Sequence, residues 1–119
     1  MNGWQVLDRR TLLDCSPWFT VLVEAVRLED GETVIPDFYH IAVAPYVIVF
    51  ALTTDRQVAL IEQYKHAVGR RVLELPAGYI EPGEEPLLAA QRELLEEAGL
   101  KAPIWRLLGA FTVDGNRGC

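Results

Sequence analysis

The chain has 119 residues, half of them apolar, and a formal net charge of −6 at pH 7. That length suffices for one hydrophobic core, and the acidic balance without a basic stripe argues against nucleic acid as the main partner. No signal-peptide core, no apolar run long enough for a bilayer and only two cysteines together predict a cytoplasmic protein without a membrane partner.

The first third of the chain predicts a β hairpin. Residues 19–28 alternate and are rich in valine, and the Asp30-Gly31 pair predicts a tight turn into residues 33–40. We therefore expect an N-terminal β module over residues 1–42, followed by a second domain over 43–119. An isolated two-stranded ribbon is marginal in water, so we expect the module to pair with a second copy in a symmetric homodimer.

The second domain predicts further strands around a single helix. Residues 46–53 form a near-continuous apolar run, typical of a central strand covered on both faces. Further strands are expected over residues 58–64, 71–75 and 104–113. This order predicts an α+β fold with a mixed sheet and a helix packed on it.

The helix is expected between Pro86 and Gly99. Proline suits the first helical position, Glu84 and Glu85 suit the positive end of the helix dipole, and a glycine suits the position just past the end. Apolar residues recur at three- and four-residue steps and predict one buried face.

Three glutamates crowd the last turns of this helix. Glu93, Glu96 and Glu97 fall within an arc of roughly 100° beside the apolar face. Like charges at these spacings repel, and Arg92 can offset part of the repulsion by pairing with Glu96. A solvated acidic face is the ordinary reading of such a run. Hard divalent cations, however, prefer convergent carboxylate oxygens, so the cluster also fits a site for Mg²⁺, with Mn²⁺ as an alternative.

Residues 78–100, GYIEPGEEPLLAAQRELLEEAGL, carry a specific pattern of glycines, glutamates and an arginine. This pattern resembles the Nudix box of enzymes that hydrolyse nucleoside diphosphates linked to another moiety. The resemblance implies a Nudix α/β/α sandwich in which Glu93 and Glu97 ligate metal. It also implies that Glu96 is a further ligand or the proton acceptor, and that the Ala77 carbonyl joins the metal site. The positions that it assigns to holding loop and helix in register are Gly78, Glu84, Arg92 and Gly99.

Two flanking stretches extend the resemblance to one group within this family. Residues 74–78, Glu-Leu-Pro-Ala-Gly, and residues 62–65, Glu-Gln-Tyr-Lys, resemble the ADP-ribose and ADP-sugar pyrophosphatase group, as does the N-terminal module, which in that group swaps between subunits. The resemblance implies Mg²⁺-dependent hydrolysis of a nucleoside diphosphate sugar such as ADP-ribose to AMP and a sugar phosphate. Candidate substrate-binding residues are Lys65, Arg70, Arg71, Glu74 and Trp18. For the two arginines and for Trp18, ordinary loop or packing roles remain open.

The sequence also departs from that group. Where members that prefer ADP-ribose have a proline, the region reads TVDGNRG, so dinucleoside polyphosphates and oxidised nucleotides remain alternative substrates. A non-catalytic nucleotide-binding module is a further alternative. Relatives continue with more strands, a loop that often carries the catalytic glutamate, and a closing helix. We therefore expect the C-terminal part of the fold to be missing, the base to lie outside these residues, and hydrolysis to be weaker than in a longer relative. We also expect residues 104–113 to be covered by another copy, or the segment after about residue 112 to be poorly ordered.

Overall fold

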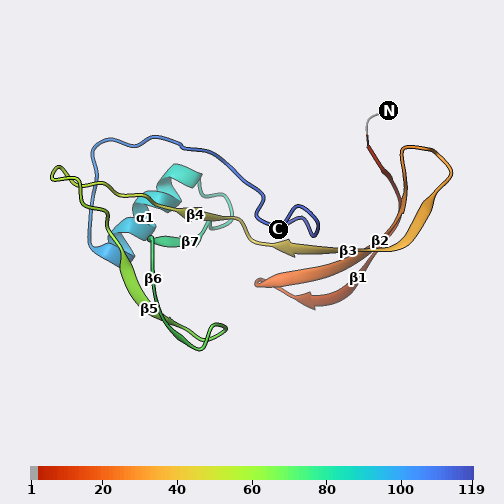
Figure 1. Ribbon diagram of the computed structural model, residues 1–119, viewed down its shortest axis with the longest axis horizontal. Helices are drawn as coiled ribbons and strands as arrows, with labels where there is room; N and C mark the ends of the chain where they lie inside the picture. Colours follow the sequence, from red (N-terminus) through yellow and green to blue (C-terminus); the bar gives the residue numbers. More distant parts are fainter. Residues whose placement is uncertain (1–2) are drawn as a thin grey trace. The chain divides into compact units, whose positions relative to one another are not determined.

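The computed structural model describes residues 3–119 and contains strands with one helix (Figure 1). In chain order the elements are β1 (Gln5–Cys15), β2 (Phe19–Arg27), β3 (Val34–Val43), β4 (Tyr46–Ile48), β5 (Ile61–Lys65), β6 (Arg70–Glu74), β7 (Ala77–Tyr79) and α1 (Pro86–Ala98). Two compact units are present: residues up to Ala44 together with Gly109–Cys119, and Pro45–Leu108. The last eleven residues are part of the first unit.

The first unit is a three-stranded antiparallel sheet in the order β1-β2-β3. The hairpin is confirmed by the antiparallel pairing of β2 with β3. In its turn, the Asp30 carboxylate accepts hydrogen bonds from the amides of Glu32 and Thr33, at 2.9 and 2.8 Å. Gly31 adopts a φ of 76° in this turn, a conformation that favours glycine. The tail returns to this sheet, since the Ile41 amide donates to the Arg117 carbonyl at 2.9 Å.

Strand β1 is an element that the sequence did not predict. Its register against β2 shifts between Val6 and Asp8 and again between Thr11 and Leu13. Each shift breaks the two-residue alternation on which a strand prediction depends. The strand is also almost wholly exposed, and its apolar residues stand in adjacent pairs such as Leu12–Leu13 rather than in alternation.

The second unit contains two short antiparallel ribbons, β4 with β7 and β5 with β6. The expected strand over residues 46–53 is wrong in length, because β4 ends at Ile48 and only single backbone hydrogen bonds continue the pairing. It is also not covered on both faces, since Ile48, Phe50 and Leu52 are more than half exposed. Every strand pairing among the described residues is antiparallel. The parallel pairs that a mixed sheet would also contain do not occur among these residues.

The strand expected over residues 104–113 is absent from the structure, which shows irregular backbone there. Strand propensity alone does not form a strand, because stability comes from ladder bonds and cross-strand packing. No described strand pairs with this segment. Five of its apolar side chains are accordingly 68 to 86% exposed: Ile104, Leu107, Leu108, Phe111 and Val113.

Helix α1 begins and ends at the residues that the sequence predicts. Pro86 begins the first turn, and Gly99 follows the last one with a left-handed φ of 68°. The Gly99 amide donates to the Leu95 carbonyl at 3.0 Å, which satisfies one of the free carbonyls at this end. Ala89 and Leu94 are buried, and the helix packs on β7 and β4. Among the described residues, no helix has the length and apolar character that crossing a bilayer requires.

Candidate active site

The packing of α1 on β7 brings a buried glutamate against a glycine. A Cβ atom added to Gly78 would overlap the carboxylate of Glu93, so the position tolerates only a hydrogen while Glu93 stays in place. The Glu93 side chain is 11% exposed. The absence of a side chain at Gly78 therefore gives the Glu93 carboxylate its place above the strand.

Arg92 is the centre of an ion-pair network that joins the loop before α1 to the helix. Its guanidinium forms a two-pronged pair with the Glu84 carboxylate, each prong 2.9 Å long. It also donates to a carboxylate oxygen of Glu93 at 2.6 Å and to the Tyr79 carbonyl at 3.0 Å. Glu96, the partner that the sequence suggested, is the most distant contact at 3.4 Å.

This network shifts the pKa values of its members. Hydrogen bonds from Arg92 lower the pKa of Glu84 from its ordinary value of 4.5 to about 2. Hydrogen bonds to Glu84 and Glu93 raise the pKa of Arg92 above its ordinary value. Both groups are therefore charged at neutral pH, and their planar fork fixes the orientation of the Arg92 side chain.

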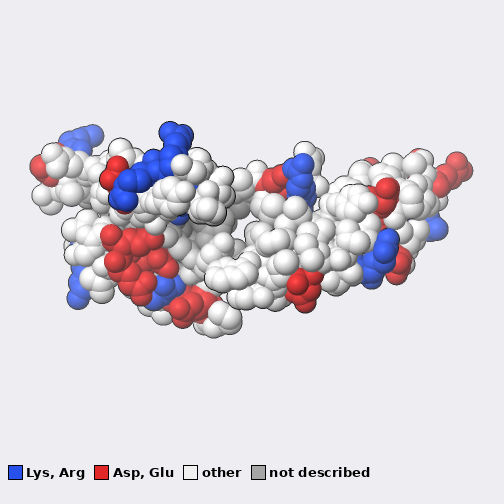
Figure 2. Space-filling view, turned by 90° about the horizontal axis from the view of Figure 1, so that it is seen from below, with Lys and Arg blue, Asp and Glu red and all other residues white. Residues whose placement is uncertain are grey.

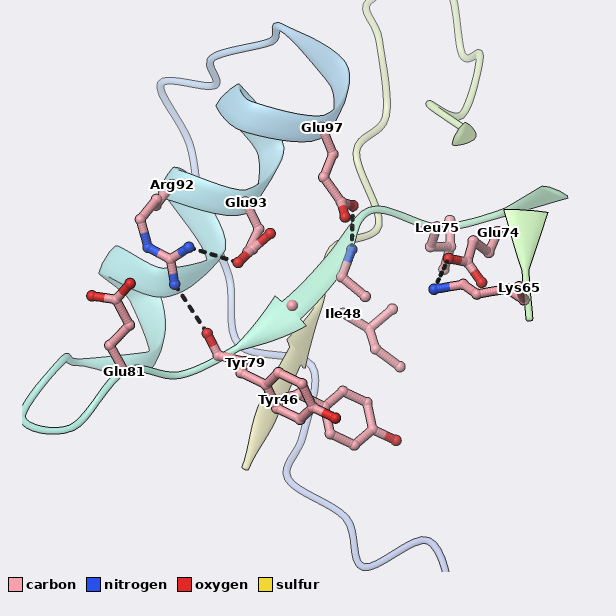
Figure 3. A pocket seen from close by; sticks show the side chains of 12 residues that line it. Tyr46, Ile48, Lys65, Glu74, Leu75, Tyr79, Glu81, Arg92, Glu93 and Glu97 are labelled. Carbon is pink, nitrogen blue, oxygen red and sulfur yellow. Dashed lines mark hydrogen bonds and ion pairs between the residues drawn. The ribbon is translucent and has the colours of Figure 1, made fainter. Parts of the chain in front are cut away.

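Glu97 is held by the backbone of β7. Its carboxylate accepts a hydrogen bond from the Ala77 amide at 2.9 Å. Glu93 and Glu97, one helical turn apart, are thus both directed to the short strand Ala77–Tyr79. Figure 3 shows the two carboxylates on the side of α1 that faces this strand.

The two glutamates line one pocket with a volume of about 770 Å³ (Figure 3). Opposite them lies an ion pair between Lys65 and Glu74, with a distance of 2.8 Å between nitrogen and oxygen. The hydrogen bond from Lys65 lowers the pKa of Glu74 below its ordinary range, and Gln63 contributes a second hydrogen bond. The full lining comprises Tyr46, Ile48, Lys65, Glu74, Leu75, Ala77, Gly78, Tyr79, Glu81, Arg92, Glu93 and Glu97.

Several predicted site residues lie elsewhere. The Glu96 side chain is 59% exposed and does not line the pocket. Arg70 and Arg71 are exposed residues of β6, and Arg71 pairs with Glu62 at 3.3 Å. Trp18 lies in the other compact unit and is 65% exposed. The pocket lining does not include Arg70, Arg71 or Trp18.

Other pocket residues were missed in the sequence. Tyr46 and Tyr79 line it because β4 pairs with β7, which places these two residues opposite each other although they are 33 residues apart along the chain (79 − 46). The apolar run around Tyr46 could have suggested a strand near the site. No local signal, however, indicates which segment it pairs with.

Glu93, Glu96 and Glu97 are not gathered into one cluster in this structure, and their role as metal ligands stays a prediction. Among residues 3–119, no three histidine, cysteine, aspartate or glutamate side chains are grouped closely enough to hold a metal ion. Carboxylates that repel one another are stabilised by separate hydrogen-bond donors. Here Glu93 accepts from Arg92, and Glu97 accepts from the Ala77 amide. The donor set nevertheless fits a hard cation, since the carboxylates of Glu93 and Glu97 project from one helix into the same pocket.

Charged side chains are unevenly distributed over the surface (Figure 2). On the face drawn in Figure 2, acidic side chains form a compact patch, and lysine and arginine side chains stand in separate small groups. A patch of this kind attracts cations, and a phosphate-bearing substrate would need them to approach it.

Comparison with protein families identifies the chain. The model of the NUDIX domain matches residues 43–119, about two thirds of the sequence. The chain belongs to the Nudix family.

Two curated relatives resemble parts of it. An ADP-ribose pyrophosphatase of Mycobacterium tuberculosis is 44% identical over 63 residues, which are 52% of this chain and 30% of the relative. A methanol dehydrogenase activator of Bacillus methanolicus is 36% identical over 92 residues, which are 77% of this chain and 49% of the relative. The chain thus spans at most about half the length of these two relatives.

A solved structure supports the fold. The crystal structure of an ADP compounds hydrolase matches with a TM-score of 0.78 and 24% identity, over 98% of this chain and 62% of the other. At that identity the likeness concerns the fold alone. The expected Nudix-type α+β fold is confirmed.

Proposed function

We propose that this Nudix chain hydrolyses the diphosphate bond of a nucleoside diphosphate sugar such as ADP-ribose and releases AMP and a sugar phosphate. The observation that carries the proposal is the pair of glutamates, Glu93 and Glu97, held over Gly78 and Ala77 in one pocket. The substrate class is supported by the similarity to a relative named ADP-ribose pyrophosphatase.

The residues present fit Mg²⁺, with Mn²⁺ as an alternative. Glu93 and Glu97 would hold it, with the Ala77 carbonyl and a rotated Glu96 as further oxygen donors. When bound, such an ion neutralises the diphosphate charge and lowers the pKa of an attached water. Release of Glu93 from Arg92 and of Glu97 from the Ala77 amide would accompany its binding.

The other pocket residues support this chemistry in separate ways. Before an ion binds, Arg92 holds the Glu93 carboxylate in the pocket, because Glu84 fixes the Arg92 guanidinium from the opposite side. Lys65 offers a cation to the substrate phosphates, and Glu74 holds that cation at the pocket wall. Glu96 lies outside the pocket lining and is exposed, and after the same rotation its carboxylate could accept a proton.

A substrate panel tests the proposal directly. The purified chain is incubated with ADP-ribose, a dinucleoside polyphosphate or an oxidised nucleotide, each with and without Mg²⁺, and the products are separated by chromatography. AMP released from ADP-ribose only with the metal supports the proposal. If only another panel compound is cleaved, the substrate belongs to the class of that compound instead. Affinity for ADP-ribose without any product would identify a binding module instead.

A further inference from the structure

Two tyrosines form an aromatic wall of the pocket. Tyr46 and Tyr79 are Cα partners in the antiparallel β4–β7 pair, and residues directly opposite in such a pair project to the same face. Their side chains are 45% and 52% exposed, and both line the pocket. Figure 3 shows the two rings on the same side of β7, next to Ile48.

The backbone of Tyr79 connects this wall to the acidic residues. Its carbonyl accepts a hydrogen bond from Arg92 at 3.0 Å, and its neighbour Gly78 faces the Glu93 carboxylate. Successive residues of a strand point to opposite faces, so the Tyr79 ring leaves β7 on the side away from Gly78's contact with α1. The ring thus lies on the other face of the β4–β7 ribbon from the Gly78–Glu93 contact, and the pocket lining includes residues of both faces.

The lining divides the pocket into chemically different parts. Carboxylates and the Lys65–Glu74 ion pair provide charged groups, which suit phosphates and sugar hydroxyls. The tyrosines and Ile48 provide flat or apolar surface. In a nucleoside diphosphate sugar, the nucleobase is the one moiety with a flat aromatic face, and exposed aromatic side chains bind bases by stacking.

We propose that Tyr46 and Tyr79 bind the nucleobase of the substrate by stacking while the diphosphate lies toward Glu93 and Glu97. The identity of the substrate rests on the proposed function. The stacking itself can be measured without turnover.

Calorimetry with two ligands tests the proposal in the presence of Mg²⁺. AMP carries the base, and ribose 5-phosphate carries the same sugar and phosphate without it. For the double variant Tyr46→Leu/Tyr79→Leu we expect AMP affinity to fall about tenfold or more, while ribose 5-phosphate affinity stays within twofold of the wild type. The double variant with phenylalanine at both positions should keep wild-type affinity for AMP, because the rings remain.

Tyr64→Leu is the matched control. This tyrosine is 55% exposed on β5 and does not line the pocket, so its replacement should leave both affinities unchanged. Thermal melts of each variant check that the fold is retained. Equal AMP affinity in the wild type and the folded leucine variant would overturn the proposal, as would a parallel loss of both ligands.

The two proposals can fail separately. If the wild type releases no AMP from ADP-ribose but the leucine variant loses AMP selectively, the hydrolysis is refuted and the base site stands. If hydrolysis occurs and the leucine variant has unchanged AMP affinity and KM, the base site is refuted and the hydrolysis stands.

Discussion

Gly78 and Glu93 illustrate how one small residue places a charged one. The space above Gly78 is filled by the Glu93 carboxylate rather than by a Cβ atom. The overlapping atoms lie at the far end of a flexible side chain, so a methyl group at position 78 can be accommodated by moving the carboxylate. The cost of such a change should therefore appear in activity more than in stability.

Gly78→Ala tests this separation. We expect at least a tenfold loss of ADP-ribose hydrolysis with only a small change in melting temperature, because Glu93 leaves its place while the backbone keeps its conformation. Gly115→Ala is the control, since a Cβ there meets no atom within 4 Å. A melting temperature far below that of the control, with activity lost in proportion to unfolding, would contradict the interpretation.

Glu93→Gln and Glu97→Gln test the roles of the two carboxylates themselves. Each substitution removes a proposed metal ligand and nearly preserves shape, so hydrolysis at saturating Mg²⁺ should fall by at least about a hundredfold. Without metal, Glu97→Gln should keep its stability or gain slightly, because carboxylate repulsion is relieved while the side-chain oxygen can still accept from the Ala77 amide. Glu93→Gln should melt slightly lower, because it loses the charge that pairs with Arg92. Steady-state kinetics and thermal melts provide both measurements, with the exposed Glu62→Gln on β5 as control. Wild-type turnover in either variant would refute the ligand assignment.

At the scale of elements, the Arg92–Glu84 pair joins the loop before α1 to the helix, and its strength depends on pH. The pKa of Glu84 is about 2 in the folded chain and lies near 4.5 when the pair is absent. A carboxylate with a lowered pKa stabilises the fold fully above its unfolded value, and this contribution disappears as pH falls toward the folded value.

Glu84→Gln should therefore melt below the wild type by a constant margin from pH 7 to about pH 5. That margin should shrink between pH 5 and pH 2, as the wild-type pair becomes protonated. Melting curves of both proteins across this range provide the measurement. A margin that persists unchanged at pH 2 would show that Glu84 stabilises the loop without its charge.

The elements that the sequence predicted well are those with local signals. Proline and glycine mark the ends of α1, and an Asp-Gly pair marks the turn before β3, because each residue satisfies a backbone requirement at its own position. Strand β1 was missed because its bulges disrupt the alternation. Residues 104–113 were predicted as a strand from their composition, but no described strand pairs with them.

The same distinction applies to the site. The spacing of Glu93 and Glu97 on a helix identified two pocket residues, since helical periodicity is a local property. The direction in which each carboxylate turns was not predictable, because it depends on Arg92 and on the Ala77 amide. The presence of Tyr46 and Tyr79 in the pocket was not predictable either, because it requires a pairing between distant segments.

At the scale of the whole molecule, large apolar side chains remain on the surface of the first unit. On β1 and the turn that follows it, Leu12, Leu13 and Trp18 are between 49 and 65% exposed. Apolar surface of this kind on a strand marks an interaction site or a liability for aggregation.

We expect this surface to mediate a symmetric homodimer. Light scattering at micromolar concentration should give about twice the mass of one chain, and Leu12→Lys should shift the mass toward the monomer because a charge would be buried at the contact. Thr11→Lys, also on β1, is the control for added charge at an exposed position. A strict monomer for the wild type at that concentration would refute the expectation.

The hydrogen bond from the Ala77 amide to Glu97 has a spectroscopic consequence. An amide proton bonded to a carboxylate is shielded differently from one that has lost this partner, so a cation that draws Glu97 away should move the Ala77 resonance. The same amide should then exchange faster with deuterated solvent. One backbone proton thus reports the side-chain position of Glu97, and titrating Mg²⁺ while following that proton would measure ion binding in the absence of any substrate.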